Sequence, residues 1–115
     1  MIKTEPDFNL TPDEILDRAS KLIVEPGIWA QGRLGRAKYG ELYEACALGT
    51  MIYVLNGDIT TSEGDWPNSL SEAMLAMSDV TGIAVPTFND HVAKDAEQVA
   101  TAVRDAATSY RIKNA

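Results

Sequence analysis

Residues that build disulfides and metal sites are almost absent from this sequence. Its 115 residues include one cysteine and one histidine, so an internal disulfide and a thiolate or imidazole zinc cage are both excluded. Carboxylates with the spacing of a metal site are also hard to find. We therefore expect neither a bound metal nor a cofactor.

Positive charge is also scarce. The chain carries 17 acidic and 10 basic residues, a net charge of −7, which opposes sequence-independent binding to nucleic acid or to anionic membranes. The first seven residues have neither the apolar core of a secretory signal nor the arginine-rich bias of a transit peptide. We expect a cytoplasmic protein whose partners are neither membranes nor nucleic acids.

The most apolar stretch gives the clearest structural signal. Residues 45–55 carry no charge on eleven consecutive positions, which is too short for a membrane span of about 20 residues and too long for a buried strand of about 4 to 8. They predict a helix over about residues 41–55 that is buried on all sides, followed by Asn56 and Gly57 as a left-handed cap. Cys46 and Gly49 are interpreted as structural residues of this core.

Amphipathic helices are predicted on both sides of this run, because apolar residues recur there every three to four positions after typical cap residues. The predicted helices cover residues 12–24, 69–82 and 95–110, with capping boxes at Thr11/Glu14 and Ser69/Glu72 and a cap near Asp95.

The remaining segments are predicted to be an arm, a hairpin and a loop. Residues 1–10 form an N-terminal arm before a single globular domain of residues 11–112. Glycines punctuate residues 28–43 and indicate a short irregular hairpin, and the polar residues 58–68 indicate a surface loop. The predicted fold class is mainly α with a small β-hairpin (α+β), with about four helices packed around the buried central helix.

The one thiol and the one imidazole of the chain are candidates for catalysis. Cys46 with His91, oriented by Asn89 or Asp90, makes a Cys–His hydrolase conceivable. A buried structural cysteine is the favoured interpretation, because small apolar residues flank Cys46 and a helix that begins at Glu41 leaves it beyond the first turn.

A single basic cluster lies in the predicted hairpin. Arg33, Arg36 and Lys38 stand among glycines, so their side chains and nearby backbone amides are candidates for binding a phosphate, a nucleotide or another anion. The glycine spacing matches neither a P-loop nor a dinucleotide fingerprint. A solvated hairpin is the favoured alternative.

Structural roles are expected for most of the other distinctive residues. Asn89 and Asp90 end an apolar segment before the last helix, which indicates a local turn or a buried side chain that reaches across to the backbone of the hairpin. Trp29 is interpreted as packed in the core. Trp66, in a polar loop, is the candidate for an exposed contact with a partner.

Three short motifs resemble a known family. Trp29-x-x-Gly32, Cys46-Ala47-Leu48-Gly49 and Asn89-Asp90 are similar to motifs in a family of small proteins of unknown function from actinobacteria and their bacteriophages. The resemblance covers approximately residues 11–110, although Thr50 replaces an expected alanine. It implies a compact, phage-encoded domain in the host cytoplasm, with no established activity and no catalytic residues to carry over.

These observations favour a non-enzymatic protein that acts by binding a host or phage protein, and they leave homo-oligomers open. The first alternative is a small anionic ligand or nucleotide binder that uses the hairpin at residues 32–40. The second is a thiol hydrolase at Cys46.

Overall fold

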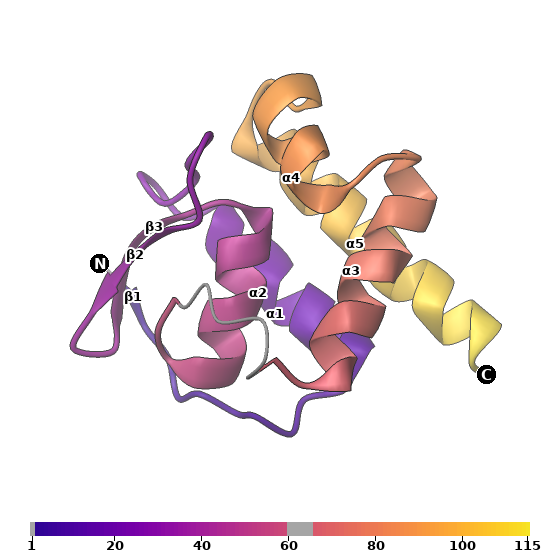
Figure 1. The fold of residues 1–115 in the computed structure, drawn as a ribbon, viewed down its shortest axis with the longest axis horizontal. Coiled ribbons are helices and arrows are strands. Elements are labelled where there is room, and N and C mark those ends of the chain that lie inside the picture. Colours follow the sequence, from indigo (N-terminus) through magenta and orange to yellow (C-terminus); the bar gives the residue numbers. More distant parts are fainter. Residues whose placement is uncertain (1, 60–65) are drawn as a thin grey trace.

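The computed structural model describes residues 2–59 and 66–115. Within these ranges four long helices, one short helix, a π-helical turn and a small three-stranded sheet form a single body (Figure 1). The prediction of a mainly helical domain with a small sheet is therefore confirmed. The elements in chain order are β1 (Ile2–Lys3), α1 (Pro12–Ile23), β2 (Gly35–Lys38), β3 (Glu41–Ala45), α2 (Ala47–Asn56), α3 (Asn68–Thr81), α4 (Val85–Thr87), the π-helical turn η2 (Phe88–Val92) and α5 (Ala96–Lys113).

The sheet is antiparallel, with strand order β1-β3-β2. Strands β2 and β3 form the predicted hairpin, and its turn residues Tyr39 and Gly40 have φ values of 54° and 77°, as a two-residue turn with both φ positive requires. The third strand comes from the N-terminal arm, where Ile2 pairs with Leu42. This strand could not be predicted from local pattern, because a two-residue strand has no periodicity.

The central helix begins later than predicted. Glu41–Ala45 is strand β3, and α2 starts at Ala47, so the predicted start at residue 41 is wrong. The apolar run therefore spans the end of a strand, a cap and a helix. Pairing with two other strands decided this boundary, and local composition does not encode it. The left-handed cap at Gly57 is confirmed, with a φ of 71°.

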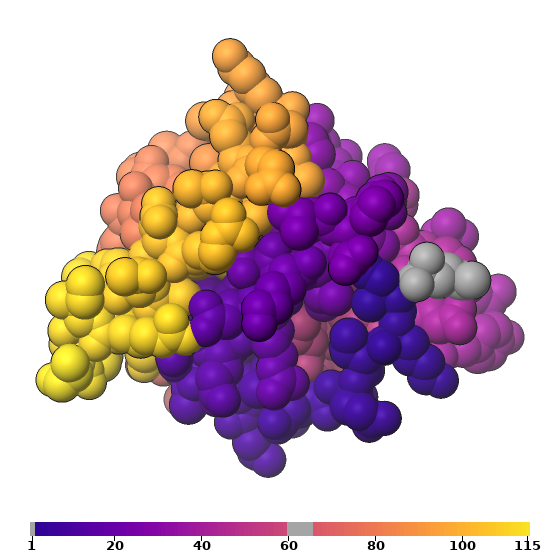
Figure 2. Space-filling view, turned by 180° about the vertical axis from the view of Figure 1, so that it is seen from behind, coloured from indigo at the N-terminus to yellow at the C-terminus, as the bar shows by residue number. Residues whose placement is uncertain are grey.

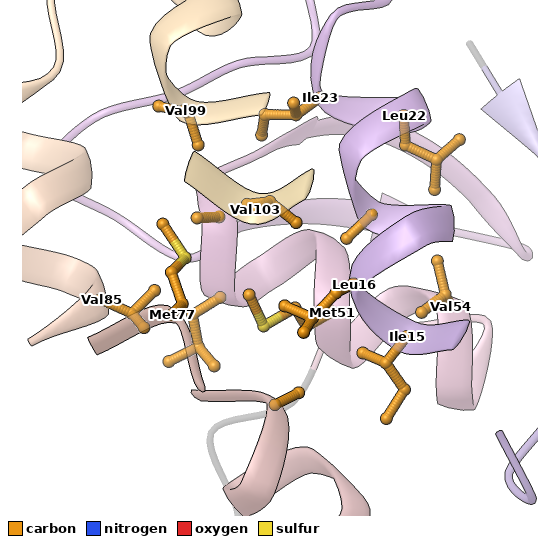
Figure 3. Packing of buried hydrophobic residues seen from close by; sticks show 14 of the residues in the cluster. Ile15, Leu16, Leu22, Ile23, Met51, Val54, Met77, Val85, Val99 and Val103 are labelled. Carbon is orange, nitrogen blue, oxygen red and sulfur yellow. The ribbon is translucent and has the colours of Figure 1, made fainter. Parts of the chain in front are cut away.

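The core is centred on two helices. Every residue of α2 from 47 to 55 is buried, as predicted for the central helix. Helix α5 packs mainly against α1 and α3, and both of these helices also contact α2. Figure 3 shows side chains of α1, α2, α3 and α5 meeting in this core, among them Leu16, Met51, Met77 and Val103.

Local cap signals were correct at two of three helices. The Thr11 N–H donates to Glu14 Oε1 at 3.0 Å before α1, and Asp95 Oδ1 accepts the Gln98 N–H at 2.8 Å at the start of α5. The box predicted at Ser69 is wrong, because α3 begins at Asn68 directly after Pro67.

The loop predicted for residues 58–68 lies mostly outside the described residues. Over the apolar segment 83–90 the structure has α4 and part of η2 in place of a simple turn. In the described part of the chain, no helix is both long and apolar enough to cross a membrane.

Gly49 allows the chain before β2 to lie against the first turn of α2. The Leu34 carbonyl oxygen accepts the Cys46 N–H at 3.0 Å. A Cβ atom built on Gly49 overlaps this same oxygen. Glycine is therefore required at position 49 by a close backbone approach.

We expect Gly49→Ala to destabilise the protein by at least about 2 kcal/mol, because the added methyl group forces backbone to move. At an unobstructed helix position the same change stabilises a protein by about 0.5 to 1 kcal/mol. The close backbone approach and an unobstructed position therefore predict changes in unfolding free energy of opposite sign. Denaturant unfolding followed by circular dichroism measures the change. Gly82→Ala is the control, since its Cβ meets nothing within 4 Å and it costs only about 1 to 2 kcal/mol of left-handed strain. A Gly49→Ala protein as stable as wild type would contradict the close approach.

Candidate functional site

One buried amide side chain joins three segments that are far apart in the sequence. Asn89 has an exposed fraction of 0%. Its Oδ1 accepts hydrogen bonds from the Trp29 indole N–H at 2.9 Å and from the Ala47 backbone N–H at 3.0 Å. Its Nδ2 donates to the Ala30 carbonyl oxygen at 2.9 Å and to Asp90 Oδ1 at 2.8 Å. Both acceptor and both donor positions of the amide are used, which offsets the cost of burying it.

Further hydrogen bonds hold the chain before the sheet against the turn that carries Asn89. Gln31 Nε2 donates to the carbonyl oxygens of Asn89 at 3.1 Å and Ala93 at 3.3 Å. Asp90 Oδ1 also accepts the Gly32 N–H at 2.9 Å. These contacts correspond to the cross-chain role that the sequence left open for Asn89 and Asp90, with one local bond between their side chains.

The π-helical turn η2 directs some of its side chains into the core and others to solvent. The Ala93 N–H donates to the Phe88 carbonyl oxygen at 2.9 Å, the long i to i+5 bond of a π-helix. Phe88 and Asn89 are buried, whereas His91 and Val92 are exposed. The turn thus exposes the polar His91 and the apolar Val92 next to the buried amide of Asn89.

Cys46 caps α2 and is buried. It is the N-cap residue, so the prediction that it lies beyond the first turn is wrong. Its Sγ accepts the Gly49 N–H at 3.4 Å, and only 5% of the residue is exposed. Burial raises the pKa of the Cys46 thiol and outweighs the opposing effect of the backbone N–H groups at the helix start.

The structure does not assemble a Cys–His relay. His91 is exposed on η2, and within residues 2–59 and 66–115 no hydrogen bond joins it to Cys46. A thiol with a raised pKa and no adjacent base is a poor nucleophile at neutral pH.

Each residue of the basic cluster has a partner in the hairpin of β2 and β3 or in its turn. Arg33 forms two hydrogen bonds with Glu44, at 2.5 and 3.0 Å, and this contact lowers the pKa of the Glu44 carboxyl group. Arg36 lies 4.9 Å from the centre of the Tyr43 ring. Lys38 lies 5.4 Å from the centre of the Tyr39 ring, so the three cations point to different partners rather than to one shared anion.

Trp66 is less exposed than its polar sequence context indicated. The residue is half-buried and packs against the hydrophobic core. Its indole N–H is buried and has no hydrogen-bond partner among residues 2–59 and 66–115. Trp29 is also half-buried and packs against the core, with its N–H on Asn89.

A groove of about 730 Å³ lies between the end of α3, η2 and the first three turns of α5. In Figure 2, α5 crosses the surface in yellow and the orange segment that includes η2 stands out beside its start. Phe88 and Ala102 are almost fully buried there, while Val80 and Val92 are 39% and 52% exposed. The apolar residues of the lining are Val80, Ile83, Phe88, Val92 and Ala102.

The charged residues of the groove are all acidic. Asp95, Glu97 and Asp105 line it from α5, together with the neutral polar residues Thr81, Gln98 and Thr101. The groove therefore combines an apolar surface with negative charge on one wall, which is an arrangement suited to a partner with apolar and cationic groups.

Sequence reasoning missed this groove and the role of Gln31. The groove is built from three separate segments. The available signal was the acidic pair Glu97 and Asp105, eight positions apart on one helix. Nothing local distinguishes Gln31, because its partners are 58 to 62 residues away.

Comparison with known proteins identifies the family of this chain. A model of a family of unknown function, DUF6197, matches residues 7–109. The chain belongs to this family. The matched range contains the Asn89 contacts and the whole groove, but not β1. The expected resemblance to an uncharacterised family is confirmed. A search of curated proteins and a search of solved structures each gave no match.

We expect Asn89→Ala to destabilise this DUF6197 member by at least about 3 kcal/mol, because it leaves several buried groups unpaired at about 1 to 3 kcal/mol each. Thermal and denaturant unfolding measure the loss. Asn9→Ala is the control, since Asn9 is exposed. Equal stability of the two variants would show that the amide does not hold the segments together.

We expect Cys46 in the native protein to resist iodoacetamide near neutral pH and to be alkylated once the protein is unfolded. Burial and the raised pKa of the thiol both oppose the reaction. Mass spectrometry of native and denatured samples checks this expectation. Rapid labelling of the native protein that persists at mildly acidic pH would instead support a thiol enzyme.

Proposed function

We propose that this protein is a non-enzymatic, cytoplasmic accessory protein of a bacteriophage or prophage that binds a host or phage protein through the groove beside α5. The observation that carries the interaction role is the groove itself, with its apolar lining and three carboxylates. The phage origin is supported by the motif resemblance alone.

The exposure of the apolar side chains favours a protein partner. Val80 and Val92 stand at the groove with large exposed fractions, although both are apolar. Exposed apolar groups that adjoin a hollow and have polar neighbours are typical of interaction sites. A partner that covers them removes apolar area from water.

The alternative functions have less support from the same contacts. An anionic ligand at the hairpin must compete with Glu44 for Arg33 and with aromatic rings for Arg36 and Lys38. A hydrolase must expose Cys46, which is buried. Binding through the groove requires no rearrangement of either region.

We expect Val92→Asp to abolish partner binding, because it places a charge in the apolar part of the groove. Ile112→Asp is the matched control, since Ile112 is exposed on α5 outside the groove lining. Immobilised wild type and both variants are incubated with a lysate of the bacterium that carries the gene. The proposal requires a protein that is retained by wild type and by Ile112→Asp and is lost with Val92→Asp.

The retained protein is then purified and its Kd for the three forms is measured. We expect at least a tenfold weaker Kd for Val92→Asp, equivalent to about 1.4 kcal/mol. Equal retention by all three proteins would contradict binding through the groove. Matched unfolding curves of the two variants verify that both are folded.

A further inference from the structure

Two carboxylates of the groove, Glu97 and Asp105, have no cationic partner in the described part of the chain. Among the described residues, the ion pairs of the protein engage Glu44, Asp13, Asp17 and Asp79. Glu97 and Asp105 take part in none of them. The negative charge on this wall is thus available to a partner.

The two carboxylates lie on one face of α5 at a defined separation. Glu97, Thr101 and Asp105 follow each other at intervals of four residues, so they form one stripe along the helix. Eight residues of helix correspond to about 12 Å between Glu97 and Asp105. A helical partner that lies along this stripe therefore needs cations about two turns apart.

The middle of the stripe is less suited to a cation than its ends. Arg104 Nη2 lies 3.4 Å from the Thr101 hydroxyl oxygen, and Arg104 is exposed. Its positive charge repels a second cation placed halfway between Glu97 and Asp105. The groove thus favours partner cations at the two ends of the stripe over a cation at its centre.

The groove walls favour a helix over an extended strand. Its walls come from α3, η2 and α5, whose backbone groups bond within their own helices, so there is no free sheet edge for strand addition. The α5 wall from Asp95 to Asp105 spans eleven residues, and ten steps along the helix axis give about 15 Å, which matches about three helical turns. Such a helix offers apolar side chains at i, i+3, i+4 and i+7 to Val80, Phe88 and Val92.

We propose, on the basis of the function proposed above, that the groove binds a basic amphipathic helix of about three turns in a partner protein, with Lys or Arg residues seven to eight positions apart facing Glu97 and Asp105. The apolar contacts provide the affinity. The two end charges select the partner and its register.

Synthetic helical peptides test this proposal. The probe carries one apolar face and two lysines eight positions apart. The comparison peptides replace both lysines by glutamates, move the lysines four positions apart, or scramble the apolar face. We expect the probe to bind at least tenfold more tightly than each comparison peptide in a fluorescence anisotropy titration. Its advantage over the glutamate peptide decreases at high salt because exposed charges are screened.

A charge swap assigns the selectivity to the groove. We expect Asp105→Lys to weaken binding of the lysine probe at least fivefold and to strengthen binding of the glutamate peptide. Glu25→Lys is the matched control, because Glu25 is an exposed carboxylate outside the groove lining, and it should change neither. Equal binding of lysine and glutamate peptides, no binding of any peptide, or a groove occupied by a second copy of this chain in sedimentation experiments would overturn the inference.

These failures are distinguishable from failure of the proposed function. If the lysate partner still depends on Val92 while the peptides show no charge preference, the groove binds a partner of another kind and only the helix proposal is wrong. If neither the partner nor the probe responds to Val92→Asp, the groove is not the binding site and both proposals fail.

Discussion

The buried amide of Asn89 is the contact on which the arrangement of the domain depends. It satisfies the Ala47 N–H at the start of α2, the Trp29 indole and the Ala30 carbonyl, and so joins η2 to α2 and to residues 28–30, which themselves pair with Ala45 through backbone hydrogen bonds. An amide in a low-dielectric interior is stable only when its donors and acceptors are all used, so this network strongly favours one relative position of the segments. Because Asn89 belongs to η2, the same contact positions Phe88 and Val92 in the groove.

The other end of α2 is held by a second polar contact. The Tyr53 side chain is buried, and its hydroxyl donates to the Gly40 carbonyl oxygen at 2.5 Å and lies 3.1 Å from that of Ile2. The turn between β2 and β3 and the N-terminal strand therefore meet on one side chain of the central helix. A helix whose own residues are almost all apolar is thus oriented at both ends by hydrogen bonds, while hydrophobic packing alone leaves its rotation and register poorly defined.

Within the described ranges, only some of the acidic residues form ion pairs with basic side chains. Arg111 pairs with Asp13 and Asp17 and so joins α5 to α1, and Arg33 pairs with Glu44 in the sheet. Exposed pairs of this kind contribute only about 0 to 1 kcal/mol each, so they fix surface geometry more than stability. The carboxylates Glu97 and Asp105 remain unpaired within the described residues, beside exposed apolar side chains. This wall of the groove therefore carries negative charge beside apolar surface.

The sequence by itself determined what depends on neighbouring residues: the helical class, the capping box at Thr11, the glycine cap after α2, the cap at Asp95 and the burial of residues 47–55. These features follow from local hydrogen bonds and from periodicity. Only the tertiary structure decided that Glu41–Ala45 is a strand, that α5 packs on α1, that Asn89 reaches partners 42 and 60 residues away, and that α3, η2 and α5 enclose a groove. The reason is physical, because strand pairing, the satisfaction of a buried amide and the shape of a groove depend on groups that meet only after the chain has folded, and no single segment carries the signal.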